Sequence, residues 1–138
     1  RSVDLHKPWV FEPPNMEAYL QRAHRRLIRV EGIGEPVGQL NLGDVIRGPL
    51  QQGFLGYCIF SPYQGRGYMG RALPLMIAYA FGEVGLHRLE ANIQPGNVAS
   101  IALVRRAGFR KEGFSPRYLN FGEGWRDHER WAITAEEA

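Results

Sequence analysis

Gln64-Gly65-Arg66-Gly67-Tyr68-Met69-Gly70 is the most informative segment of this sequence. It follows an apolar segment, residues 54–60, and it opens a segment with helical periodicity. A glycine-rich turn between a strand and a helix leaves several backbone N–H groups unpaired and pointing in one direction, and the helix dipole adds partial positive charge there. The stretch therefore predicts a binding site for phosphate or pyrophosphate oxygens.

Two familiar phosphate-binding patterns fit this stretch poorly. A P-loop has four residues between its glycines and then Lys-Ser or Lys-Thr, and the stretch has neither. The dinucleotide-binding pattern G-x-G-x-x-G is matched by Gly65, Gly67 and Gly70, and Glu90 lies where a ribose-binding acid is expected. In that fold the strand runs directly into its first glycine, whereas residues 61–64 intervene here. A nicotinamide-dependent oxidoreductase and a glycine-rich turn without a ligand stay open as alternatives.

Length and composition predict one compact domain, residues 1–138, with 44% hydrophobic residues. No apolar run approaches the roughly 18 residues of a transmembrane helix, and we find no secretory signal, so we expect a cytoplasmic protein. The single cysteine, Cys58, excludes an internal disulfide and is expected to be a small buried hydrophobe rather than a catalytic thiol. Because the sequence begins at Arg1 rather than Met, we expect the domain to be incomplete at its N-terminus.

The charge balance is mildly basic, with 17 Lys and Arg against 14 Asp and Glu and a net charge of +3. Arginines gather in residues 22–29 and again in residues 105–111. Such groups favour CoA phosphates, an acidic partner or nucleic acid, but they are also typical of solvated helix faces. No basic run with interleaved aromatic residues indicates a dedicated nucleic-acid surface.

The helix after the glycine-rich stretch has the clearest periodicity. Its core-facing positions are Met69, Ala72, Leu73, Met76, Ile77, Ala80, Phe81 and Val84. Pro74 has no N–H for the carbonyl of Gly70, so we expect the helix to begin near Gly70 and to end at Gly85.

The other segments predict a mixed sheet. An earlier helix is indicated by Asn15 as N-cap and by an apolar stripe at Met16, Leu20, Ala23 and Leu27. Strands are predicted at residues 37–42, 54–60 and 88–93, and Asn97 can cap a short helix over residues 98–107. Residues 109–133 read as a meander whose last two strands, 118–121 and 125–133, are joined by Gly122-Glu123-Gly124. The order of elements favours a mixed α/β sheet over a doubly wound one.

The glycine-rich stretch also resembles the acetyl-CoA loop of the Gcn5-related N-acetyltransferases (GNAT), Gln/Arg-x-x-Gly-x-Gly/Ala, at Gln64 and Gly67. Met69 departs from that pattern, but the Rim-type members, which acetylate the N-terminal α-amine of ribosomal proteins, commonly carry Met there. Three further segments are similar to Rim-type ribosomal-protein-alanine N-acetyltransferases: Asn97-Val98-Ala99-Ser100 with Arg106-Ala107-Gly108-Phe109, the closing residues 118–128, and residues 37–57 with Val45-Ile46-Arg47-Gly48. The resemblance covers residues 35–133. It implies the GNAT fold, a central mixed and mostly antiparallel sheet flanked by helices, with the family's first strand missing before Arg1.

The resemblance also implies the site residues. Those expected to bind acetyl-CoA are Cys58, Ile59, Phe60, Gln64, Gly65, Arg66, Gly67, Tyr68, Met69, Gly70, Asn97, Ser100 and Arg105. Many relatives protonate the leaving thiolate with a Tyr at the position held here by Val104, so Ser100 is the candidate acid. Glu90 is the first candidate base, with His87 and His128 behind it, and no metal is expected. Both residues also have a non-catalytic interpretation. Ser100 is then a polar residue in the first turn of a helix, and Glu90 forms an ion pair with Arg88.

The sequence thus predicts transfer of an acetyl group from acetyl-CoA to a primary amine. The resemblance points to a protein or peptide N-terminus, possibly ribosomal, as acceptor, with no membrane partner, and to a monomer or homodimer. Two alternatives stay open: an acetyltransferase for small-molecule amines, and an acyl-CoA-binding module that has lost catalysis because it has Val at position 104.

Overall fold

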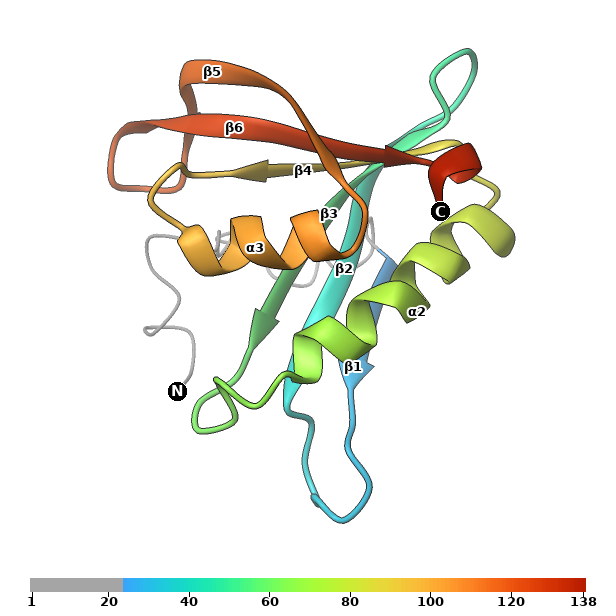
Figure 1. The fold of residues 1–138 in the computed structure, drawn as a ribbon, viewed down its shortest axis with the longest axis vertical. Coiled ribbons are helices and arrows are strands. Elements are labelled where there is room, and N and C mark those ends of the chain that lie inside the picture. Colours follow the sequence, from blue (N-terminus) through green and yellow to red (C-terminus); the bar gives the residue numbers. More distant parts are fainter. Residues whose placement is uncertain (1–23) are drawn as a thin grey trace.

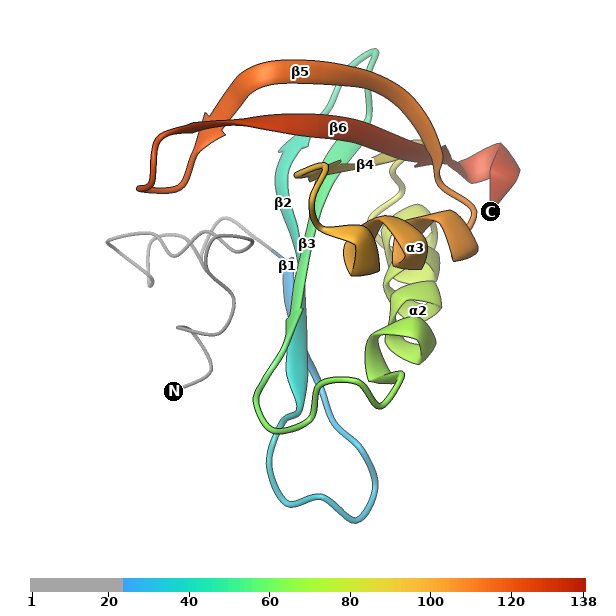
Figure 2. The same cartoon turned by 60° about the vertical axis from the view of Figure 1, so that its left-hand side comes forward.

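The computed structural model of the protein describes residues 24–138 (Figures 1 and 2). The strands are β1 (His24–Ile28), β2 (Gly38–Ile46), β3 (Gln52–Ile59), β4 (Arg88–Ile93), β5 (Arg110–Asn120) and β6 (Trp125–Thr134). The helices are α2 (Tyr68–Gly82), α3 (Val98–Arg106) and a short 3-10 helix, η2 (Ala135–Glu137).

These strands form one sheet in the order β1-β2-β3-β4-β6-β5. Every neighbouring pair is antiparallel except β3 and β4, which are parallel because α2 carries the chain back between them. Helices α2 and α3 lie on the same face of the sheet (Figure 2). This arrangement confirms the predicted mixed and mostly antiparallel sheet.

The core lies between that face and the two helices. Its buried members on α2 are Met69, Leu73, Met76, Ile77 and Ala80, which are spaced by three or four residues. They pack against alternate residues of the strands, among them Leu40 and Leu42 of β2 and Leu89 of β4. The predicted apolar stripe of α2 is therefore the stripe that the sheet covers.

Helix α2 begins at Tyr68, two residues before the predicted start, and ends at Gly82 rather than Gly85. Pro74 consequently lies inside the helix instead of in its first turn. Both Pro74 and Gly70 are exposed, so water can hydrogen bond to the Gly70 carbonyl that the proline leaves without a partner.

Two other predictions were wrong. The helical stripe drawn through Leu27 ends in β1, where Leu27 pairs with Gln39 of β2; the rest of that segment lies outside the described residues. Residues 110–120 after α3 form one long strand, β5, where a meander with a short strand at 118–121 was predicted, whereas the predicted last strand, 125–133, is confirmed as β6. Two register shifts interrupt the pairing of β5 with β6, and Arg117 has a φ of 48°, so the alternation that identifies a strand is broken in the sequence.

Within residues 24–138 no helix is both long and apolar enough to cross a membrane.

Candidate active site

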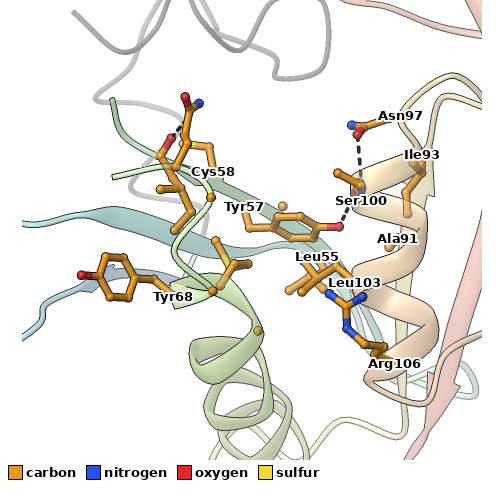
Figure 3. Close-up of a pocket in the computed structure, with 18 of the residues that line it drawn as sticks. Leu55, Tyr57, Cys58, Tyr68, Ala91, Ile93, Asn97, Ser100, Leu103 and Arg106 are labelled. Carbon is orange, nitrogen blue, oxygen red and sulfur yellow. Dashed lines mark hydrogen bonds between the residues drawn. The ribbon is translucent and has the colours of Figure 1, made fainter. Parts of the chain in front are cut away.

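The candidate site is a wedge inside the sheet, between β3 and β4. These parallel strands pair at three positions only, from Gln52 with Arg88 to Phe54 with Glu90. Beyond them the strands diverge and enclose a cavity of about 380 Å³. Its walls come from residues 55–59 of β3, residues 91–94 at the end of β4, one side of α3, and residues 63–70, which form a loop and the start of α2 (Figure 3).

The divergence leaves backbone groups of β3 without a strand partner. Phe60 donates its N–H to the carbonyl of Val37, at 2.7 Å, on the side of β2. Because hydrogen-bonding direction alternates along an antiparallel strand, the N–H of Cys58 also faces β2, and those of Tyr57 and Ile59 face the wedge. Phe60, a predicted CoA contact, lies outside the cavity lining, and its N–H is already used.

The glycine-rich loop has the geometry of an anion site. Gly65 and Gly67 have φ values of 79° and 76°, which glycine adopts without strain. Gly67 is the N-cap of α2, and no side chain caps the first N–H groups of the helix. A Cβ added to Gly65, Gly67 or Gly70 would meet nothing within 4 Å, so the surface of the loop is open. These unpaired N–H groups lie along the cavity and are suited to phosphate oxygens.

Positive charge in the cavity lining also favours the binding of phosphate groups. Among the described residues, the cavity lining includes the arginines Arg66 and Arg106 and no Asp or Glu. Arg105, the predicted contact, is not part of the lining: its guanidinium lies 5.3 Å from the centre of the Trp131 ring. Arg106 shares a side of α3 with Ser100 and Leu103, each three residues apart, so helical periodicity alone indicates Arg106 rather than Arg105.

Ser100 forms hydrogen bonds through both its backbone and its side chain. Its N–H donates to Oδ1 of the N-cap Asn97 at 3.2 Å, and its hydroxyl forms a hydrogen bond with the hydroxyl of Tyr57 from β3 (Figure 3). Burial raises the pKa of Tyr57 above its ordinary value, so this phenol is neutral at pH 7. Val104 is fully buried in the core and is not part of the cavity lining. Sequence reasoning missed Tyr57, because the contact joins residues 43 positions apart.

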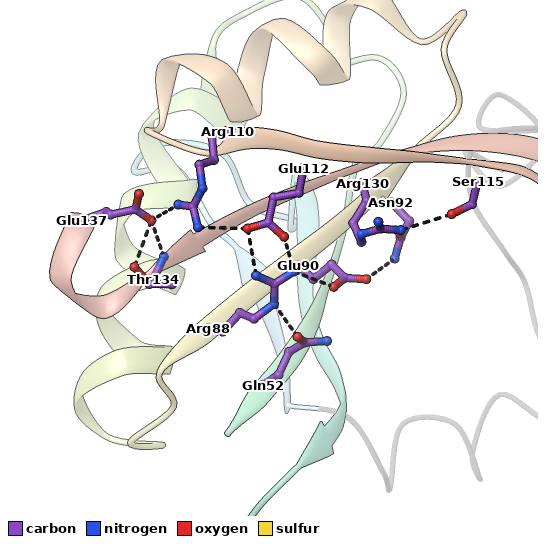
Figure 4. A network of polar contacts seen from close by, with 10 residues as sticks. All are labelled: Gln52, Arg88, Glu90, Asn92, Arg110, Glu112, Ser115, Arg130, Thr134 and Glu137. Carbon is purple, nitrogen blue, oxygen red and sulfur yellow. Dashed lines mark hydrogen bonds and ion pairs between the residues drawn. The ribbon is translucent and has the colours of Figure 1, made fainter. Parts of the chain in front are cut away.

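Glu90 is part of a network of ion pairs and hydrogen bonds outside the cavity. Its side chain forms an ion pair with Arg88 at 2.9 Å and accepts from Asn92 at 3.2 Å (Figure 4). Arg88 also pairs with Glu112 of β5 at 2.7 Å, and this guanidinium lowers the pKa of Glu112. Glu90 does not line the cavity and is only 6% exposed. The structure therefore favours the ion-pair interpretation of Glu90 over a catalytic base.

His128, by contrast, lines the cavity. Its Nδ1 lies 3.0 Å from the carbonyl oxygen of Arg126, which can only accept, so Nδ1 carries the proton and Nε2 has the free lone pair. The ring is 1% exposed and packs edge-on against Tyr118 and Phe121. Burial lowers the pKa of His128, which keeps it neutral at pH 7. His87 instead pairs with Glu136 at 2.8 Å and takes no part in the cavity lining.

The remaining predicted contacts, Cys58, Ile59, Asn97, Ser100 and residues 64–70, all line the cavity. Burial raises the pKa of the Cys58 thiol, which therefore stays protonated and is a poor nucleophile. No group of three or more His, Cys, Asp or Glu side chains that could hold a metal ion occurs within residues 24–138.

Residues 3–110 match the family model described as the acetyltransferase (GNAT) domain. The chain belongs to the GNAT acetyltransferase family. It is 39% identical over 97 residues to "Probable N-acetyltransferase YjcK" of Bacillus subtilis, covering 70% of this chain and 54% of that protein. It is also 39% identical over 103 residues to the [ribosomal protein uS5]-alanine N-acetyltransferase of Escherichia coli, covering 75% of this chain and 53% of that protein. The chain thus spans about half the length of these curated GNAT relatives.

Among solved GNAT structures, the chain is similar to Mycobacterium smegmatis RimJ in complex with CoA-disulfide. The TM-score is 0.84 at 35% sequence identity, over 97% of this chain and 73% of that one.

Proposed function

We propose that this protein transfers the acetyl group of acetyl-CoA to the α-amine at the N-terminus of a protein, with a ribosomal protein as the favoured acceptor. The observation that carries the proposal is the wedge between β3 and β4, which joins an uncapped helix N-terminus to Ser100 and His128 in one cavity. The names of the E. coli and M. smegmatis relatives support both the cosubstrate and the acceptor class.

The cavity offers partners for the pyrophosphate and the pantetheine arm of acetyl-CoA. The pyrophosphate binds to the N–H groups of residues 65–70, with Arg66 and Arg106 supplying positive charge. The pantetheine arm, which carries amide groups, lies along the unpaired edge of β3 as an added strand would. Gln64, Asn97 and the buried Cys58 complete the walls.

The reaction then needs three groups from this chain. His128 Nε2 accepts the proton that the amine loses as its nitrogen bonds to the acetyl carbon. A backbone N–H of Tyr57 or Ile59 donates to the oxygen that becomes negative in the tetrahedral intermediate. As the carbon–sulfur bond breaks, the electron pair goes to sulfur, and Ser100 supplies the proton that makes the free thiol.

The electrostatics of the cavity favour an α-amine over a polycation. The described lining residues carry no carboxylate, whereas a spermidine-like acceptor needs negative charge around it. An α-amine titrates near pH 8 and a Lys side chain near about 10.4, so at pH 7 roughly a tenth of α-amines are neutral, against fewer than one in a thousand lysines. One buried histidine therefore suffices as the base for an α-amine.

The test is acetylation of a peptide with a free N-terminal Ala and an internal Lys, followed by mass spectrometry of the product. We expect the acetyl group on the α-amine. The same peptide with a blocked N-terminus is the matched control and should not react. Acetylation of the Lys alone, or turnover of small polyamines alone, would refute the proposed acceptor.

Ligand binding separates the remaining alternatives. CoA should raise the melting temperature and NAD should not; stabilisation by NAD alone would point to an oxidoreductase. CoA binding without turnover of any amine would identify a binding module that has lost catalysis.

A further inference from the structure

The hydroxyl groups of Tyr57 and Ser100 meet across the cavity, one from β3 and the other from α3 (Figure 3). Both residues line the space that the proposed function gives to the reactive end of acetyl-CoA. The contact spans the wedge at the point where β3 has left β4, so it also links the two walls of the cavity.

A serine near the start of a helix has a competing use for its hydroxyl proton. Its O–H commonly donates back to a carbonyl three or four residues earlier, and a proton used in that way is not directed at a ligand. Asn97 fixes the backbone of Ser100 through the N–H but leaves the rotation of the hydroxyl free. A second contact is needed to set the direction of the O–H.

We propose that Tyr57 is a positioning residue that donates its hydroxyl proton to Ser100 Oγ and so directs the Ser100 O–H toward the sulfur of acetyl-CoA. The inference rests on the proposed acetyl transfer. Tyr57 suits the role because its burial keeps the phenol neutral, with a proton to donate, throughout the pH range in which the amine is reactive. The aromatic ring also fixes the position of the oxygen, since it is packed against the core.

The proton balance closes without a further reagent. When the carbon–sulfur bond breaks, sulfur takes the electron pair and the Ser100 proton. The hydrogen bond from Tyr57 stabilises the negative charge that develops on Ser100 Oγ. The proton released by the amine, carried by His128 and water, then restores the Ser100 hydroxyl. One proton leaves nitrogen and one reaches sulfur, and Tyr57 ends as it began.

The first test is a double-mutant cycle on the acetyl transfer rate. Ser100→Ala should lower kcat by roughly 10²–10⁴-fold, the usual range for acid catalysis. Tyr57→Phe keeps the ring, and we expect a smaller loss, about tenfold, with the Kd for CoA unchanged within about twofold. Because Tyr57 acts through Ser100, the double variant should be no slower than Ser100→Ala alone. Multiplied losses in the double variant, or a normal kcat for Tyr57→Phe, would overturn the proposal.

A matched control removes another tyrosine hydroxyl. Tyr79 on α2 forms a hydrogen bond with His24 Nδ1 at 2.8 Å and lies outside the cavity lining. Tyr79→Phe should leave kcat as it is in the wild type, so a general effect of losing a hydroxyl is excluded.

A second test needs no acceptor and no turnover. The thiol of bound CoA is titrated by the difference in ultraviolet absorbance between bound and free CoA. A donor at the sulfur stabilises the thiolate, so the pKa of this thiol should be lower in the wild type than in Tyr57→Phe and Ser100→Ala. Equal pKa values in all three proteins would overturn the role of Tyr57. Peptides left unmodified despite this pKa difference would refute the proposed function alone.

Discussion

Phe54 on β3 and Glu90 on β4 are the last two residues at which these parallel strands stay in register. Beyond this pair each strand keeps one neighbour, β2 for β3 and β6 for β4, and the edges that face each other carry no ladder. An unpaired strand edge exposes backbone donors and acceptors that need a partner. The sheet therefore opens at its centre, and the backbone groups along the two edges are available to hydrogen bond with a ligand or with water.

Gly53, directly before Phe54, lies against two core side chains that leave no room for a Cβ. A Cβ at this position would lie 2.4 Å from Leu42 Cδ1 and 3.0 Å from Leu86 Cδ1, both in the core. Gly53→Ala should therefore lower the free energy of unfolding by about 1–3 kcal/mol, because the core is overpacked. Urea denaturation measures the loss.

The control for Gly53 is Gly82 at the end of α2. A Cβ there meets nothing within 4 Å, and Ala favours helix over Gly by up to about 1 kcal/mol. Gly82→Ala should match or exceed the wild type in stability. If Gly53→Ala were as stable as Gly82→Ala, the core around Leu42 and Leu86 would not be tightly packed against Gly53.

Gly67 should decide whether CoA binds. Its φ of 76° is costly for any residue with a Cβ, and a side chain there would enter the space given to the pyrophosphate. CoA at a hundredfold excess over its Kd should stabilise the wild type by about 2.7 kcal/mol and should leave Gly67→Val unchanged. Gly122, with a φ of 109° in the β5–β6 turn, supplies the control. Gly122→Val carries similar backbone strain, yet its melting temperature should still rise with CoA.

The sequence predicted the fold well where local signals agreed with tertiary packing. Strand β4 has the predicted bounds, and Asn97 caps α3 as expected, because alternation and capping are local properties. Strand β1 was missed since Leu27 fits a helical stripe by spacing, and only its pairing with Gln39 decides otherwise. Strand β5 was misjudged because its register shifts have no signature in the sequence.

In the candidate site, too, local contacts could be predicted from the sequence and contacts between distant segments could not. Contacts within one segment, such as the loop 64–70 or Ser100 with Asn97, follow from motif and spacing. The pairing of Tyr57 with Ser100 and the burial of His128 depend on elements that are distant in the sequence. Glu90 was favoured as a base for its place on the polar face of a strand, and only the fold shows that Arg88 and Asn92 occupy it.

Arg106 and Arg105 offer a matched pair of substitutions on adjacent residues of α3. Arg106→Gln removes a positive charge from the cavity and should raise the KM for acetyl-CoA roughly tenfold, the loss of one charge-assisted contact. Arg105→Gln removes the same charge from the surface over Trp131 and should change the KM less than twofold. Added salt should narrow the difference between the two variants. The reverse ranking would restore Arg105 as the contact.

The buried His128 makes stability depend on pH. Its pKa is lowered by burial, so in the unfolded chain it binds a proton near about pH 6.5, whereas in the folded protein it does so only at a lower pH. The unfolded state thus holds more protons in this interval, and the free energy of unfolding should fall as the pH drops below about 6.5, by at most about 1.4 kcal/mol per pH unit from this group. Above that pH His128 is neutral in both states and contributes no pH dependence to the free energy of unfolding.

His128→Gln should reduce the fall in the free energy of unfolding between about pH 6.5 and 5.5. His87→Gln, which removes an exposed ion pair with Glu136, should retain that fall. Urea denaturation at a series of pH values measures both, and an unchanged slope in His128→Gln would mean that the imidazole is not held neutral by the fold.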